Sequence, residues 1–72
     1  MYARVLEHHG ETRRFTISAG AQAGGWDVKE ERGSQVIWSQ HFTDWHRVER
    51  ARMTMAREIR DLELAGWRVS VA

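Results

Sequence analysis

The most regular pattern in the chain is a run of apolar residues spaced three and four apart between Thr43 and Trp67. At about 100° per residue these side chains share one arc of a helical wheel, which predicts an amphipathic helix with a core-facing side. Thr43 or Asp44 can serve as N-cap, and Gly66 suits the left-handed position of a Schellman cap that returns Trp67 onto Leu62. The predicted core-facing residues are Trp45, Val48, Ala51, Met55, Ala56, Ile59 and Leu62.

The residues before this helix alternate with the period of β-strands. Residues 2–9 and 13–18 are rich in strand formers and flank Gly10, which predicts a hairpin. A register that places apolar residues on one face and opposite charges across the strands is the most favourable. The expected pairs are Glu7–Arg13, Val5–Phe15 and Ala3–Ile17.

A second hairpin is predicted from residues 26–30 and 34–42, with Glu31-Arg32-Gly33 between them. A three-residue loop of this kind places its glycine in the left-handed position of a bulge. The expected pairs are Glu30–Ser34, Val28–Val36 and Trp26–Trp38, which would bury both Val36 and Trp38. Residues 20–25, GAQAGG, read as a flexible connector between the two hairpins.

After the helix, alternation over residues 67–71 indicates a short strand that could cover an open sheet edge, in this molecule or in a partner. The chain therefore predicts one α+β domain over residues 1–72. Its architecture is an antiparallel β-meander of two hairpins packed on one long C-terminal helix, followed by a short last strand. The predicted core consists of Val5, Phe15, Ile17, Trp26, Val28, Val36, Trp38, Trp45, Val48, Met55, Ile59 and Leu62.

Length and composition limit how this domain can be stabilised. A chain of 72 residues has a small core and buries only about 60% of its unfolded surface. There are no cysteines, so disulfides and thiolate zinc sites are excluded, and self-association could supply stability instead. Without a window of 18 apolar residues or the apolar region of a signal peptide, we expect a soluble, cytoplasmic protein with no membrane segment.

Charge is nearly balanced over the whole chain, whereas the outward face of the predicted helix is basic. The chain contains eleven Lys and Arg residues and ten Asp and Glu residues, and Lys29 is the one lysine among them. The outward helix face carries two apolar residues among arginines, and these two form a candidate protein interface: Met53 and Leu64. The alternative partner is nucleic acid, bound through Arg47, Arg50, Arg57 and Arg60, or through Tyr2, Arg4 and Arg14 on the sheet face away from the helix.

No arrangement of residues indicates catalysis or metal binding. The chain has no cysteine, and its serines occupy ordinary strand or turn positions rather than standing beside a base. His41, Asp44 and His46 cluster near the helix start, but their spacing matches no zinc or two-histidine-carboxylate pattern. We therefore predict a protein that is not an enzyme and that needs no cofactor or metal.

The order of elements from Trp26 onward resembles a known module. GWDV, a hairpin, VIW and a helix that carries Ala51 and Met55 and ends in Gly66-Trp67 are similar to the WGR-type module of DNA-repair proteins. The Trp-Gly-Arg tripeptide of that family is absent, so none of its DNA-contacting residues is carried over. A looser likeness in architecture is to the four-strand-plus-helix single-strand-binding transcription cofactors. Both resemblances imply nucleic-acid binding.

Two functions from different classes follow. The first is a small non-catalytic protein-interaction or homodimerisation module, indicated by the small core, an open strand edge and the exposed pair Met53 and Leu64. The second is a DNA-binding module that uses the arginines of the helix or of the sheet face. The biological process and the physiological partner do not follow from residues alone.

Overall fold

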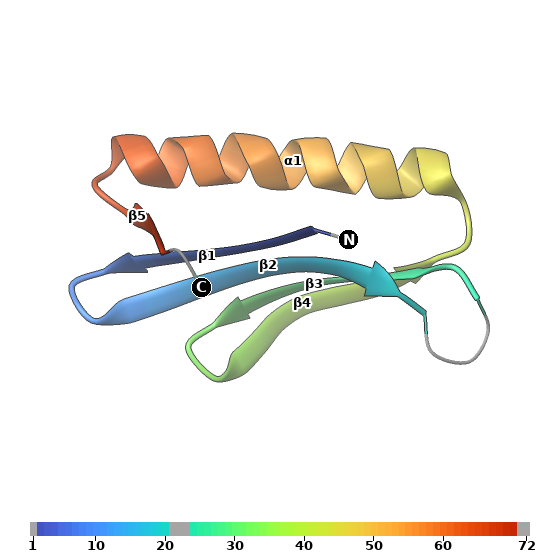
Figure 1. The fold of residues 1–72 in the computed structure, drawn as a ribbon, viewed down its shortest axis with the longest axis horizontal. Coiled ribbons are helices and arrows are strands. Elements are labelled where there is room, and N and C mark those ends of the chain that lie inside the picture. Colours follow the sequence, from blue (N-terminus) through green and yellow to red (C-terminus); the bar gives the residue numbers. More distant parts are fainter. Residues whose placement is uncertain (1, 21–23, 71–72) are drawn as a thin grey trace.

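Two layers make up the computed structural model, which describes residues 2–20 and 24–70 (Figure 1). One layer is an antiparallel sheet with strand order β4-β3-β2-β1-β5, and the other is α1, which runs along one face of the sheet. The predicted α+β fold is confirmed. The elements are β1 (Tyr2–His8), β2 (Glu11–Ala19), β3 (Trp26–Arg32), β4 (Gln35–Phe42), α1 (Trp45–Leu64) and β5 (Arg68–Ser70).

A two-residue turn at His9-Gly10 sets the register of the first hairpin. Both residues have positive φ, 50° and 81°, the signature of a type I′ turn. The strands therefore pair as Arg4↔Phe15 and Leu6↔Arg13, one residue away from the predicted register. Since side chains alternate across a strand, this one-residue difference turns Leu6 toward the helix and Val5 away from it.

The second hairpin also turns through two residues, Gly33 and Ser34, rather than the predicted three. Only the first has positive φ, 61°, as a type II′ turn requires. The register then shifts at Glu30/Glu31, where β4 contains one extra residue, Ile37, which is a β-bulge. The observed pairs Glu30↔Trp38, Val28↔Gln40 and Trp26↔Phe42 replace the predicted ones, which were wrong.

The core lies between the sheet and the inner side of α1, and its buried members are Leu6, Phe15, Ile17, Val28, Val48, Met55 and Ile59. Trp26 and Leu62 are partly buried against this cluster. Six residues of the predicted core are therefore confirmed as buried: Phe15, Ile17, Val28, Val48, Met55 and Ile59.

Four residues of the predicted core are not buried in the core, and the prediction that Ala56 faces the core was also wrong. Val5 is half-buried on the other sheet face, and Ala56 is exposed on the helix. Val36, Trp38 and Trp45 are exposed, by 49%, 42% and 49%. Trp45 sits at the start of the helix beside Trp26, with ring centroids 5.1 Å apart, and about half of it remains exposed.

Both ends of α1 match the predicted caps. The Asp44 carboxylate accepts a hydrogen bond of 2.9 Å from the His46 backbone N–H, so Asp44 rather than Thr43 is the N-cap. At the other end Trp67 N–H donates to Leu62 O (3.0 Å) and Gly66 N–H donates to Glu63 O (3.1 Å). With φ of 104° at Gly66, this is the Schellman motif.

The Schellman turn directs β5 onto β1, where Leu6 pairs with Val69. The predicted last strand therefore covers an edge of its own sheet; Val71 of that prediction lies outside the described residues, as do residues 21–23 of the predicted glycine-rich connector. At the base of that connector, Gly20 N–H donates to Gly25 O at 2.9 Å.

One helix is too narrow to cover five strands. At about 4.8 Å per strand the outer strands are about 19 Å apart, whereas a helix with its side chains is about 10–12 Å wide. The buried side chains of β2 and β3 lie under α1, so β4 extends beyond the cover that the helix provides. Trp38 thus faces the helix side of the sheet and is still exposed.

Candidate functional site

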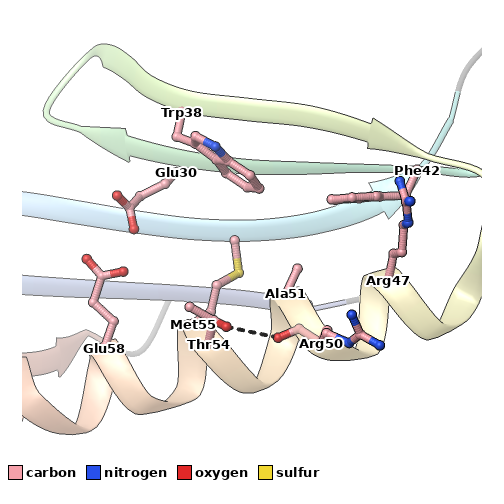
Figure 2. A pocket seen from close by; sticks show the side chains of 9 residues that line it. All are labelled: Glu30, Trp38, Phe42, Arg47, Arg50, Ala51, Thr54, Met55 and Glu58. Atoms are coloured by element: carbon pink, nitrogen blue, oxygen red, sulfur yellow. Dashed lines mark hydrogen bonds between the residues drawn. The ribbon is translucent and has the colours of Figure 1, made fainter.

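The uncovered strip between α1 and β4 forms a groove with a volume of about 600 Å³ (Figure 2). It is lined by Glu30 of β3, by Trp38 and Phe42 of β4, and by one side of the helix. We call it the α1–β4 groove. Its lining residues are Glu30, Trp38, Phe42, Arg47, Arg50, Ala51, Thr54, Met55 and Glu58.

The middle of the α1–β4 groove is apolar. Trp38 and Phe42 of β4 pair with Glu30 and Trp26 of β3, which lie on the same face of the sheet as buried Val28. Trp38 and Phe42 therefore project from β4 on the helix side. Figure 2 shows Trp38, Phe42 and Met55 directed into the same space, with Ala51 behind them. The small side chain of Ala51 leaves room between the helix and the strand, so the groove can accept apolar side chains from a partner.

One end of the groove is acidic. Arg13 on β2 pairs with both carboxylates there, at 2.7 Å from Glu58 and 3.3 Å from Glu30. Burial raises the pKa of Glu30 above the usual glutamate value, the hydrogen bond and charge of Glu58 raise it further, and Arg13 opposes the shift. This end thus holds two carboxyl groups and one guanidinium, so it has one acidic group more than it has basic groups.

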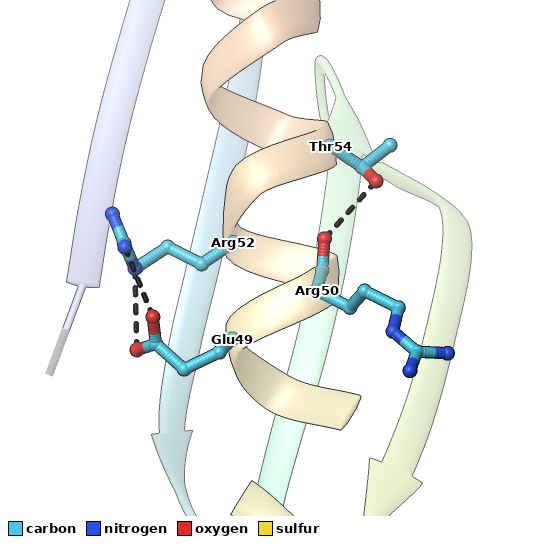
Figure 3. A network of polar contacts seen from close by, with 4 residues as sticks. All are labelled: Glu49, Arg50, Arg52 and Thr54. Atoms are coloured by element: carbon cyan, nitrogen blue, oxygen red, sulfur yellow. Dashed lines mark hydrogen bonds and ion pairs between the residues drawn. The ribbon is translucent and has the colours of Figure 1, made fainter. Parts of the chain in front are cut away.

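The other end of the groove is basic. Arg47 lies beside Phe42, and Arg50 projects toward β4 (Figures 2 and 3). Within the described part of the chain no carboxylate lies within 4.0 Å of either guanidinium. Arg52, by contrast, projects to the β1 side, where Glu49 holds it at 3.0 Å (Figure 3). The groove is thus polarised along its length.

β4 itself is an open edge of the sheet. It is the outermost strand on its side, and no described strand pairs with its outer edge. Val36, Ile37 and Trp38 follow one another along it with exposures of 49%, 45% and 42%. The strand has eight residues and contains no Asp, Glu, Lys or Arg. An open edge of this length, with exposed apolar residues and without acidic residues, Lys or Arg, is a template for pairing with another strand.

The structure separates the predicted interface residues. Met53 and Leu64 are both exposed on the outer side of α1, by 57% and 81%. They are eleven residues apart, which is about 16 Å along a helix, and charged residues lie between them. They do not form one continuous apolar patch.

The predicted nucleic-acid residues also fall into separate groups. Arg47 and Arg50 line the groove, whereas Arg57 and Arg60 are exposed elsewhere on α1. The predicted placement of Tyr2 and Arg4 on the far sheet face was wrong, because the one-residue register change turns them to the helix side. There Tyr2 packs against the core, and the Arg4 guanidinium lies 4.7 Å from the centre of the Tyr2 ring. Arg14 remains on the far face, where it approaches Glu31 at 4.0 Å.

The residues that line the apolar part of the groove were missed at the sequence level because Trp38 was assigned to the core. Two signals could have revealed them. Gly33-Ser34 is a recognisable two-residue turn with glycine first, and it fixes a different register. The absence of charge over residues 35–42 also distinguishes β4 from the other strands.

Histidines outside the groove have partners of their own. His41 lies 2.7 Å from Asp27 on the far face of the sheet, and His8 stacks on Trp67 with ring centroids 5.3 Å apart. Among residues 2–20 and 24–70 no three His, Asp or Glu side chains are arranged to hold a metal ion.

The described helix α1 lacks the apolar length that a membrane span requires. No family model, curated protein or solved structure matches this chain.

Proposed function

We propose that this chain is a small protein-interaction module that binds an extended protein segment along β4. The observation that carries the proposal is the β4 edge, eight residues long, without acidic or basic residues, and with three consecutive apolar residues exposed by 42–49%. Strand addition to such an edge supplies backbone hydrogen bonds for affinity, and pockets for alternate side chains supply specificity.

The α1–β4 groove provides such a pocket next to the edge. Successive side chains of an added strand point to opposite faces, so every second one would enter the space lined by Trp38, Phe42 and Met55. A volume of about 600 Å³ lies within the usual range for binding sites in proteins. A partner segment with an apolar residue at every second position fits this arrangement.

The polar groups of the groove support a binding role rather than a catalytic one. Its two carboxylates are both engaged by Arg13. Among the lining residues Thr54 carries the one hydroxyl, which donates to the Arg50 backbone oxygen at 3.1 Å. No lining residue combines a nucleophile with a neighbouring base, which covalent catalysis needs.

Selection from a phage-displayed library of random linear peptides, at protein concentrations low enough to disfavour self-association, tests the proposal. We expect enriched peptides with alternating apolar residues that bind the wild-type chain and lose at least tenfold in affinity for the double variant Val36→Lys/Ile37→Lys. The matched control is Met53→Lys/Leu64→Lys, which places the same charges on the outer side of α1 and should leave binding unchanged. Peptides that bind both double variants equally, or failure to enrich any peptide from a chain that is also monomeric, would contradict the proposal.

One observation favours nucleic acid as a second candidate. The groove brings Arg47 and Arg50 to the end that holds half-buried Phe42, with exposed Trp38 further along the same groove, and a basic surface with aromatic rings is the usual means of binding single strands. The resemblance of the chain from Trp26 onward to WGR-type modules favours the same candidate. The carboxylates at the other end of the groove restrict such a site to the Arg47–Phe42 end.

An NMR titration of labelled protein with a short single-stranded DNA separates this candidate from the first. Binding through Arg47 and Arg50 predicts amide shifts at the Phe42 end of the groove that decrease steeply between low and moderate salt. Arg47→Ala/Arg50→Ala should abolish the shifts, whereas Arg57→Ala/Arg60→Ala should reduce them only slightly. Shifts that persist unchanged with salt, or that vanish equally in both variants, would exclude the groove as a nucleic-acid site.

A further inference from the structure

The helix-side residues of β4 have a symmetric order. Trp38, Gln40 and Phe42 point to that side, because they pair with Glu30, Val28 and Trp26 of β3. An aromatic residue therefore stands two positions before Gln40 and another stands two positions after it. A strand with this pattern is complementary to a second, antiparallel copy of itself.

The β-bulge fixes where such pairing can occur. The ladder to β3 is interrupted between Glu30 and Glu31, opposite Ile37, and is regular from Trp38 to Phe42. A bulge bends and twists its strand, so the five residues after it form the longest regular stretch of the β4 edge on which a further strand can be centred. The centre of these five residues is Gln40, the same residue about which the aromatic pattern is symmetric.

We infer that the segment which occupies β4 is β4 of a second copy of this chain, paired antiparallel about a two-fold axis at Gln40. In this arrangement Trp38 lies opposite Phe42 of the second copy, Gln40 lies opposite its own equivalent, and the two sheets form one continuous sheet. Such an interface is isologous, as in most homodimers. The inference rests on the proposed function, since it names the partner of the same edge and groove.

The charges of the groove agree with this orientation. The surplus carboxylate at the Glu30–Glu58 end lies near Trp38, and the basic end with Arg47 lies near Phe42 (Figure 2). Antiparallel pairing brings Trp38 of one copy to Phe42 of the other, so each acidic end meets a basic end. The raised pKa of Glu30 means that its charged form lacks full compensation in one copy, and a cation from the second copy would supply it.

The apolar surface on the helix side of β4 would be buried in such a dimer. Exposed Trp38 and half-buried Phe42 of both copies would fill the space between the two helices, where each helix leaves its own β4 uncovered. Aromatic residues are enriched at the buried centres of interfaces. The described part of the chain has seven buried core residues, and a domain with so small a core can be stabilised by dimerisation.

Sedimentation equilibrium of the full chain from low to high micromolar concentration tests the inference. We expect a monomer–dimer equilibrium and at least a tenfold higher dissociation constant for Gln40→Lys, because the two-fold axis places the two lysines opposite each other. Met53→Lys is the matched control and should leave the constant unchanged. A dimer that Met53→Lys dissociates and Gln40→Lys does not would overturn the inference in favour of the helix face.

A cross-linking measurement covers the case in which Gln40→Lys does not fold. The sequence contains no cysteine, so Gln40→Cys introduces a single thiol per chain. Opposite residues of an antiparallel pair are about 4.5–5.5 Å apart at Cβ, close to what a disulfide needs. We expect rapid disulfide dimers from Gln40→Cys and none at the same protein concentration from Met53→Cys.

The two proposals fail in different ways. A strictly monomeric chain at high micromolar concentration, with no cross-link from Gln40→Cys, overturns the inference about the second copy. Selected peptides that still bind wild type and not Val36→Lys/Ile37→Lys would then leave the β4 interaction module standing with a foreign partner. Absence of both results would remove both proposals.

Discussion

The two edges of the sheet are built in opposite ways. β5 forms one edge with three residues, and the Schellman turn at Gly66 together with the stacking of Trp67 on His8 fixes its position. β4 forms the other edge with eight residues, of which Val36, Ile37 and Trp38 are exposed and none is Asp, Glu, Lys or Arg. Natural sheets usually protect their edges with short strands, charges or cover. The β5 edge follows this rule, whereas among the described residues β4 is protected by a bulge alone, which is why we assign binding to β4.

The largest difference between the edges should be in stability. Leu6 is fully buried and pairs with Val69 of β5, so Leu6→Ala should cost about 2–5 kcal/mol of unfolding free energy through lost burial and a cavity. Val36 on β4 is 49% exposed, and Val36→Ala should cost about 0.5 kcal/mol or less. Urea unfolding of both variants measures this contrast. Equal losses would mean that β4 is covered in the folded protein.

Gly66→Ala should loosen the β5 edge. A Cβ at this residue would lie 3.2 Å from His8 Nε2, and φ of 104° disfavours any L side chain, so we expect a loss of about 1–2 kcal/mol. Hydrogen exchange should accelerate at the amides of β5. The matched control is Gly33→Ala, which has positive φ but no atom within 4 Å of the added Cβ. If β5 exchanges at the wild-type rate in Gly66→Ala, the Schellman turn does not hold that edge in place.

Asp44→Ala tests the connection between β4 and the helix. The carboxylate accepts from the His46 N–H at 2.9 Å, and loss of an N-cap side chain costs about 1 kcal/mol. Asp44→Asn keeps the acceptor and should lie within a few tenths of a kcal/mol of wild type. Thermal unfolding compares the three proteins. An equal loss in the alanine and asparagine variants would show that the charge, and not the cap hydrogen bond, matters there.

The smallest effect concerns the pH dependence at the acidic end of the groove. Because the pKa of Glu30 is raised in the folded state, this state binds a proton more tightly than the unfolded chain. The contribution of Glu30 to the unfolding free energy therefore increases as the pH falls through the range just above the usual pKa of glutamate. It is lost as the pH rises through the same range. The unfolding free energy of wild type minus that of Glu30→Gln, measured over this range, should show this slope. A difference that is flat or has the opposite sign would contradict the assigned direction.

Local signals in the sequence predicted the helix and its ends well. The three-and-four spacing of Val48, Met55 and Ile59 required no knowledge of the rest of the fold, and Gly66 indicated the Schellman turn through its own conformational freedom. The number of strands and their order along the chain also followed from alternation and turns, whereas the sheet edge that β5 joins did not. These features depend on neighbours within a few residues, which sequence patterns record directly.

The register of the strands and the part of the sheet that α1 covers could not be predicted from local patterns. A turn one residue shorter than expected exchanged Val5 for Leu6 in the core and moved Tyr2 from one sheet face to the other. The exposure of Trp38 depends on how far a single helix reaches across five strands, which no local pattern encodes. The groove was therefore missed, although Arg47 and Arg50 were predicted to be surface arginines and Trp38 was predicted to be a core aromatic.

The pairing of β1 with β5 has a kinetic consequence. These strands lie at opposite ends of the described chain, with Glu7 paired to Arg68, while each hairpin joins residues that are close in sequence. Contacts between distant segments form late, because the intervening chain must first be brought together. Until then β1 presents an unpaired edge, which β5 of a neighbouring molecule can also reach when the protein concentration is high. Refolding at high protein concentration should therefore yield some strand-exchanged molecules, and dilution before refolding should suppress them.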